Sequence, residues 1–198
     1  MQLIFEIRQE QDIYDDSDFG DPAQFSIWLE DLETQAVRTV FVTHSTGTGE
    51  FIGKVDCPVA LPVWIGIFRE ETGRTDFPRP WKPMVDAVTG ATPKVKEFAI
   101  TTLVESGKTW NYYIEMNVAG DYNATFPSMT SGKHPDYHGN GQPSLIYRGR
   151  ITATRGATSK PELIGRSLQH YFTTTINPDL TGIGSARKAF SAIAVICK

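Results

Sequence analysis

Several features that define large protein classes are missing from this sequence of 198 residues. The formal net charge is −4 and no block of basic residues is present, which excludes a nucleic-acid binder because such binding depends on phosphate contacts. No apolar run is long enough to cross a bilayer, so we predict no transmembrane segment. Residues 1–8 lack the basic start and long apolar stretch of a signal peptide, so we expect either a cytosolic chain or one that has lost a leader.

Cysteine and histidine are also scarce. The two cysteines, Cys57 and Cys197, lack metal-site spacing and are expected to be buried thiols, or a disulfide if the protein is exported. His134 and His138 are four positions apart, but the Pro and Gly beside them disfavour a helix and therefore a zinc site. No Gly-x-Ser-x-Gly elbow occurs. We therefore predict no catalytic and no metal-binding residue.

Acidic residues occur in two settings. The Asp-rich stretch at residues 12–21 does not follow the spacing of an EF-hand loop, so we interpret it as a solvated loop. Four further carboxylates are expected near strand ends. Solvation there is the default, although a pair could converge for acid–base chemistry. These four are Glu30, Asp31, Glu115 and Asp121.

Alternation of apolar and polar residues dominates the chain and predicts half-buried strands. The expected strands are residues 2–8, 24–30, 36–43, 95–104, 110–118, 144–154, 162–172 and 189–197. One helix is expected at residues 61–71, with Pro62 in its first turn and Gly73 ending it. Residues 43–49 and 130–142 are expected to be loops, the second projecting from the surface. The pattern predicts a single all-β domain over residues 1–198, an antiparallel sandwich with one short helix.

A specific chemistry is indicated only at Asp86-Ala87-Val88-Thr89-Gly90-Ala91-Thr92. This pattern resembles the motif at which bacterial flavin transferases attach FMN through a phosphoester. The resemblance implies that Thr92 is the acceptor and that Asp86 helps the transferase to dock through its metal. Thr89, Gly90 and Ala91 complete the cofactor-binding set, and the last two leave no bulk beside the hydroxyl. The alternative is a plain turn leading into the next strand.

The chain contains a second Gly-Ala-Thr triplet, Gly156-Ala157-Thr158. It has Thr152 where the motif requires Asp and Arg155 where the motif requires Ser or Thr. The triplet by itself is therefore weak support, and only the longer pattern around Thr92 favours flavin attachment.

Segments spread over most of the chain resemble a bacterial family of predicted periplasmic proteins, domain of unknown function family 2271. The segments are residues 25–31, 37–40, 61–64, 86–93, 113–117, 120–123 and 141–147. The resemblance implies an immunoglobulin-like sandwich, a periplasmic or extracytoplasmic location, and participation in flavin-dependent electron transfer.

Together these observations predict a one-domain electron carrier with FMN on Thr92 and the flavin ring near Phe77 and Trp81. Its partners would be a flavin transferase and a redox protein, and it would not be a stand-alone enzyme. The alternative is a cofactor-free binding or structural module. Such a module would contact a protein through residues 134–142 and Tyr137, or a carbohydrate through Trp and Tyr platforms.

Overall fold

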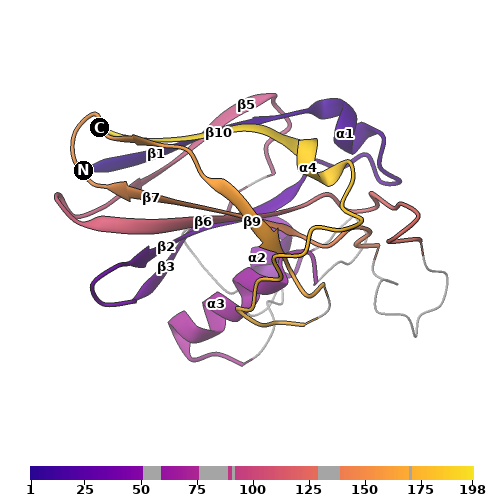
Figure 1. The fold of residues 1–198 in the computed structure, drawn as a ribbon, viewed down its shortest axis with the longest axis horizontal. Helices are drawn as coiled ribbons and strands as arrows, with labels where there is room; N and C mark the ends of the chain where they lie inside the picture. Colours follow the sequence, from indigo (N-terminus) through magenta and orange to yellow (C-terminus); the bar gives the residue numbers. More distant parts are fainter. Residues whose placement is uncertain (51–58, 76–88, 91, 129–138, 170) are drawn as a thin grey trace.

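The computed structural model describes residues 1–50, 59–75, 89–90, 92–128, 139–169 and 171–198. These residues form two stacked β-sheets (Figure 1). One sheet has the order β5-β1-β10-β8 and the other the order β4-β3-β2-β6-β7-β9. The predicted all-β sandwich is confirmed. Its strands are β1 (Gln2–Gln9), β2 (Gln24–Asp31), β3 (Val37–Thr43), β4 (Thr89–Gly90), β5 (Glu97–Leu103), β6 (Thr109–Asn117), β7 (Leu145–Thr152), β8 (Thr158–Ser159), β9 (Glu162–Arg166) and β10 (Phe190–Cys197).

The alternating pattern of the strands builds the core between the sheets. In β1 the side chains of Leu3, Phe5 and Ile7 are buried, whereas Glu6 and Arg8 are exposed. β6 contributes Tyr112, Ile114 and Met116 to the same cluster from the opposite sheet. Apolar side chains at every second position therefore fill the space between the sheets, as the period of a strand requires.

The strand order is that of an immunoglobulin-type sandwich in its central part. β7-β6-β2-β3 corresponds to strands G, F, C and C′ of that fold, and β1-β5 corresponds to strands B and E. One strand differs in origin. In that fold strand A lies beside strand B. Here β10, from the opposite end of the chain, takes this position and pairs antiparallel with β1. The two chain ends therefore lie side by side in one sheet (Figure 1).

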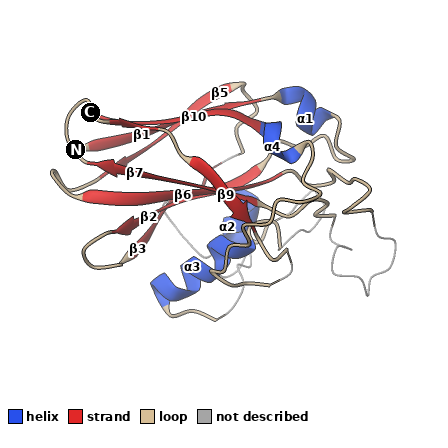
Figure 2. Cartoon of the chain, in the orientation of Figure 1, coloured by secondary structure: helices blue, strands red, loops and turns tan. Residues whose placement is uncertain are grey.

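The predicted helix is confirmed as α3 (Pro62–Thr72), which covers the outer face of the six-stranded sheet (Figure 2). Trp64 of α3 lies in a second buried cluster that includes Trp28 of β2 and Ile146 of β7. Gly73 ends the helix with a φ of 68°, a left-handed conformation that favours glycine.

Three further helices in the described ranges were not predicted: α1 (Gln11–Asp15), α2 (His44–Thr48) and α4 (Ala186–Ala189). The prediction of a single helix, and of a loop at residues 43–49, was wrong at these places. Each of the three is five residues or fewer, too short to show a helical period in the sequence. None of the described helices is long and apolar enough to span a membrane.

Two predicted boundaries also differ from the structure. β9 ends at Arg166, where the chain turns away and Arg166 pairs with Asn177 instead, so the predicted strand to residue 172 is too long. Residues 139–142 are buried, so this end of the predicted projecting loop does not project. Gln142 is fully buried, and its side-chain amide is satisfied there because it donates to the backbone oxygen and to Oδ2 of Asp121. His134 and Tyr137 lie outside the described residues.

Candidate functional site

The described part of the predicted flavin motif lies at the edge of the six-stranded sheet. Thr89 and Gly90 form β4, which runs parallel to β3 with Thr89 opposite Val42 and Gly90 opposite Thr43. Asp86 and Ala91 lie outside the described residues, as do Phe77 and Trp81. The alternative of a plain turn predicted an unusual backbone angle at Gly90. In the structure Gly90 lies in a short paired strand and is not among the glycines with positive φ.

The structure gives a packing reason for the glycine at position 90. A Cβ atom there would lie 2.6 Å from Cε2 of Phe41, a ring that is itself buried in the core. Any larger residue would have to displace this ring, which stacks on Phe25 at 4.8 Å. Gly90 therefore allows the β4 backbone to approach Phe41 closely.

Thr92 follows β4 and is half-buried. Its Oγ1 accepts a hydrogen bond of 3.3 Å from Nε2 of Gln24 in β2. Oε1 of Gln24 accepts from the hydroxyls of Thr43, at 2.7 Å, and Thr46, at 3.3 Å. We call Gln24, Thr43, Thr46 and Thr92 the Gln24 cluster. The bond to Thr92 is long and neutral, so the hydroxyl is held weakly.

The chain after Thr92 is fixed to the other sheet. Nε2 of the buried Gln9, at the end of β1, donates to the backbone oxygens of Pro93 and Val95, both at 2.8 Å. Thr92 thus lies between a glutamine from each sheet. Neither glutamine was predicted from the sequence to contact the Thr92 segment. A signal for Gln9 was present, because it continues the inward register of Leu3, Phe5 and Ile7.

The prediction that Glu115 is a solvated strand-end residue was wrong. Its side chain is 0% exposed, and its carboxylate accepts hydrogen bonds from the backbone N–H groups of Val63 (3.1 Å) and Trp64 (2.6 Å) and from the Ser144 hydroxyl (2.6 Å). Leu61, which precedes α3, has no side-chain cap, so Glu115 of β6 caps the helix from the sheet. We call Glu115, Val63, Trp64 and Ser144 the Glu115 cluster.

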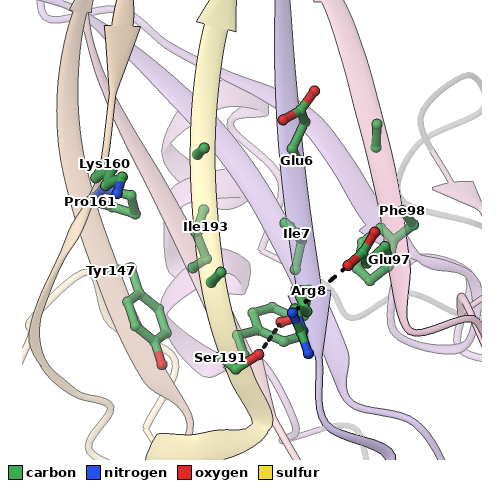
Figure 3. A pocket seen from close by; sticks show the side chains of 14 residues that line it. Glu6, Ile7, Arg8, Glu97, Phe98, Tyr147, Lys160, Pro161, Ser191 and Ile193 are labelled. Atoms are coloured by element: carbon green, nitrogen blue, oxygen red, sulfur yellow. Dashed lines mark hydrogen bonds and ion pairs between the residues drawn. The ribbon is translucent and has the colours of Figure 1, made fainter.

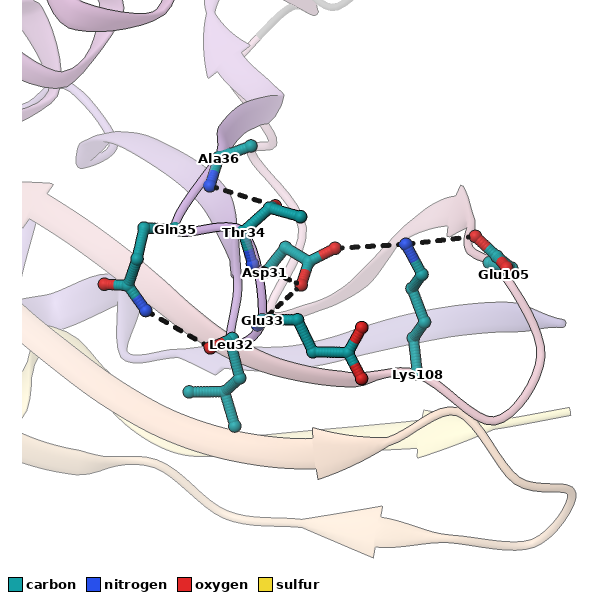
Figure 4. Close-up of polar contacts among 8 residues, drawn as sticks. All are labelled: Asp31, Leu32, Glu33, Thr34, Gln35, Ala36, Glu105 and Lys108. Carbon is teal, nitrogen blue, oxygen red and sulfur yellow. Dashed lines mark hydrogen bonds and ion pairs between the residues drawn. The ribbon is translucent and has the colours of Figure 1, made fainter.

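Asp31 and Asp121 are each only 5% exposed, so the expectation of solvation was wrong for them too. Oδ1 of Asp31 accepts from the N–H groups of Glu33 and Thr34, and Oδ2 lies 3.2 Å from Nζ of Lys108 (Figure 4). These contacts, above all the Glu33 N–H, lower the pKa of Asp31. They fix the turn between β2 and β3. Asp121 accepts from both nitrogens of Gln142 and has the same kind of structural role.

A hollow with a volume of about 990 Å³ lies on the four-stranded sheet (Figure 3). It extends over β1, β5 and β10, and Arg8 and Glu97 on its floor form an ion pair of 4.0 Å. None of the described motif residues lines it. Within the described residues no group of His, Cys, Asp or Glu is arranged to hold a metal ion, and Cys197 is a buried free thiol. Cys57 lies outside the described residues.

Comparison with known proteins gave no match: no family model, no curated protein and no solved structure resembles the chain. Membership of family 2271 and the flavin motif therefore remain predictions from the sequence. The Thr92 hydroxyl accepts a weak hydrogen bond, whereas the backbone that follows it is held by Gln9. This arrangement would allow the hydroxyl to be modified while the backbone stays in place.

Proposed function

We propose that the protein is an extracytoplasmic carrier of covalently attached FMN, with Thr92 as the attachment residue. The observation that supports this most directly is the state of the Thr92 hydroxyl. It is half-buried, and within the described part of the chain its one hydrogen bond comes from a neutral amide at 3.3 Å. Such an oxygen can form a bond to phosphorus, and lose its hydrogen bond from Gln24, without unfolding the protein.

The surroundings of Thr92 fit an attachment point. Gln9 and Gln24 hold the segment from both sheets, so a group bound to Oγ1 would have a defined origin. The exposed Lys94 follows two positions later and could offset the charge of a phosphodiester, whereas Lys96 forms an ion pair with Glu10. FMN would supply the redox chemistry, and this chain would supply attachment and orientation.

The attachment step is a phosphoryl transfer carried out by a partner enzyme. The donor is a phosphoanhydride of FMN. The Thr92 oxygen forms a bond to the FMN phosphorus, the anhydride bond breaks so that the other phosphate group leaves, and the hydroxyl proton is released to solvent. The mass of the chain then rises by one FMN less one water. Thr89 and Gly90 keep the segment paired to β3, so only Thr92 needs to be presented to the transferase.

The cofactor-free module is supported less well by the described residues. Trp28 and Trp64 are buried and cannot serve as platforms for a sugar ring. The proposed protein-contact loop ends in the buried Gln142, and the rest of it lies outside the described residues.

The test is to co-express the chain with a bacterial flavin transferase and to measure its intact mass and in-gel flavin fluorescence. We expect the mass of one FMN less one water in the parent chain and in Thr92→Ser, and an unchanged mass in Thr92→Ala. Thr158→Ala is the matched control, because Thr158 ends the other Gly-Ala-Thr triplet and is exposed in β8. The proposal fails if the parent chain stays unmodified beside an active transferase, or if Thr92→Ala is modified as fully as the parent.

A further inference from the structure

A second cavity, independent of Thr92, lies on the outer face of the six-stranded sheet. It has a volume of about 380 Å³ and is enclosed by β2, β3, β6, α3 and the segment 174–176. This size is within the range of about 300–1,000 Å³ typical of small-molecule sites. We call it the α3 cavity.

The floor of the α3 cavity is aromatic. Trp28 and Tyr113 stack with ring centroids 5.1 Å apart and planes 3° from parallel. Val63 and Ile67 of α3 form one wall, and Ile176 lies on another. Trp28 is buried and supports the ring of the half-buried Tyr113, which can contact the apolar part of a ligand and attract a cation to its face.

Two carboxylates give the α3 cavity its charge. Glu30 of β2 and Glu70 of α3 both line it, and among the described lining residues there is no Lys or Arg. Among the described residues, the hydrogen bonds to these carboxylates come from neutral groups. Oε2 of Glu30 accepts from the Tyr113 hydroxyl and the Asn111 amide, both at 2.9 Å, and Glu70 accepts from the Thr174 hydroxyl at 3.3 Å.

Arg148 of β7 is a cation on the same sheet face. It is the cross-strand partner of Tyr113 and interacts with the Tyr113 hydroxyl. It does not line the cavity, so Glu30 and Glu70 face the cavity space without a positive side chain between them.

We propose that the α3 cavity binds an organic cation, an ammonium or guanidinium group on an apolar stem. The stem would pack on Tyr113 and the α3 wall, and the charge would lie between Glu30 and Glu70. An anion would meet two negative charges, and a neutral ligand would gain no attraction from the half-buried Glu30 or the exposed Glu70. The cation can come from a free amine or from a Lys or Arg side chain of a partner, and the chemistry of recognition is the same.

Calorimetric titration of the full chain tests this with three probes. Phenethylamine carries the cation on an aromatic stem, 2-phenylethanol is its neutral counterpart, and the tripeptide acetyl-Gly-Lys-Gly-amide presents a lysine side chain. We expect phenethylamine or the tripeptide to bind and 2-phenylethanol to bind at least about tenfold more weakly. Tighter binding of the tripeptide would identify a protein as the source of the cation, and tighter binding of phenethylamine would identify a free amine.

The variants Glu30→Gln and Glu70→Gln should each weaken cation binding about tenfold, since each removes one facing charge. Glu33→Gln is the matched control. Glu33 is exposed on the adjacent turn and does not line the cavity, so the variant makes the same change in net charge without touching the site. Circular dichroism verifies that each variant is folded. The proposal is overturned if neither cation binds, if 2-phenylethanol binds as tightly as phenethylamine, or if Glu33→Gln weakens binding as much as the two cavity variants.

Discussion

The Gln24 cluster and the Glu115 cluster both contain buried polar groups at the six-stranded sheet. They differ in charge and in the number of hydrogen bonds that the Thr92 hydroxyl and the Glu115 carboxylate accept. Glu115 is an ionisable group with three donors at 2.6–3.1 Å. The Thr92 hydroxyl is neutral and, among the residues that the structure describes, has one donor at 3.3 Å. The first is completely buried, whereas the second is half-buried.

This difference separates a structural site from an adaptable one. A buried carboxylate with several donors cannot be removed without leaving those donors unpaired. A half-buried hydroxyl with one weak donor can lose that bond, because water can take its place. The comparison therefore assigns Glu115 to the stability of the fold and leaves Thr92 available for modification. Three experiments would test this distinction, beginning with the largest effect.

Replacing Glu115 with Ala should lower the free energy of unfolding by about 2–4 kcal/mol, because the N–H groups of Val63 and Trp64 and the Ser144 hydroxyl lose their acceptor. Urea unfolding at neutral pH measures this. Ser144→Ala is the graded control. It removes one donor and leaves both helix amides bonded, so it should cost only about 1 kcal/mol. A loss below about 1 kcal/mol in Glu115→Ala would mean that the carboxylate does not hold α3 to the sheet.

The second experiment uses the titration of Glu115. Burial raises its pKa to about 7, although the hydrogen bonds from Ser144, Trp64 and Val63 lower it. The ordinary value, expected in the unfolded chain, is 4.5. Between these two values the folded protein binds a proton that the unfolded chain has released. The contribution of Glu115 to the free energy of unfolding is therefore greatest at low pH and falls as the pH rises through this window, by about 3 kcal/mol in all.

Urea unfolding of the parent chain and of Glu115→Gln across this pH window isolates the contribution of Glu115, because all other groups titrate in both proteins. The difference between the two should change with pH in the stated direction. Parallel curves for the two proteins would show that the carboxyl titrates at an ordinary pKa and is not desolvated as the structure indicates.

Much of the fold could be predicted from the sequence because strand alternation is a local property. The residues of β1 and β6 alternate in the sequence as they do in the sheets. The burial of Glu115 could not be predicted in this way. It follows Tyr113 on the outer face of β6, which solvent covers in many sandwiches, and here α3 covers that face. The one clue was indirect, since Leu61 cannot cap the helix that follows it.

The site around Thr92 was predictable only in part, for a similar reason. The motif identified the threonine, but its partner Gln24 lies 68 positions away and forms no pattern with it. The glycines of the two Gly-Ala-Thr triplets also adopt different conformations. Gly90 lies in a paired strand, whereas Gly156 has a φ of 82° before β8. A shared triplet does not determine a shared conformation, because the neighbouring strands decide it.

The smallest expected effect is that of Thr92→Ala on stability. We expect the free energy of unfolding to fall by less than about 0.5 kcal/mol, because Thr92 is only half-buried and the bond lost is one long hydrogen bond. Urea unfolding of this variant beside Thr158→Ala, which changes an exposed threonine, provides the comparison. A fall of more than about 1 kcal/mol would place Thr92 with Glu115 as a structural residue. A small effect would mean that any loss of flavin attachment in Thr92→Ala results from the missing acceptor oxygen, since the fold would be unchanged.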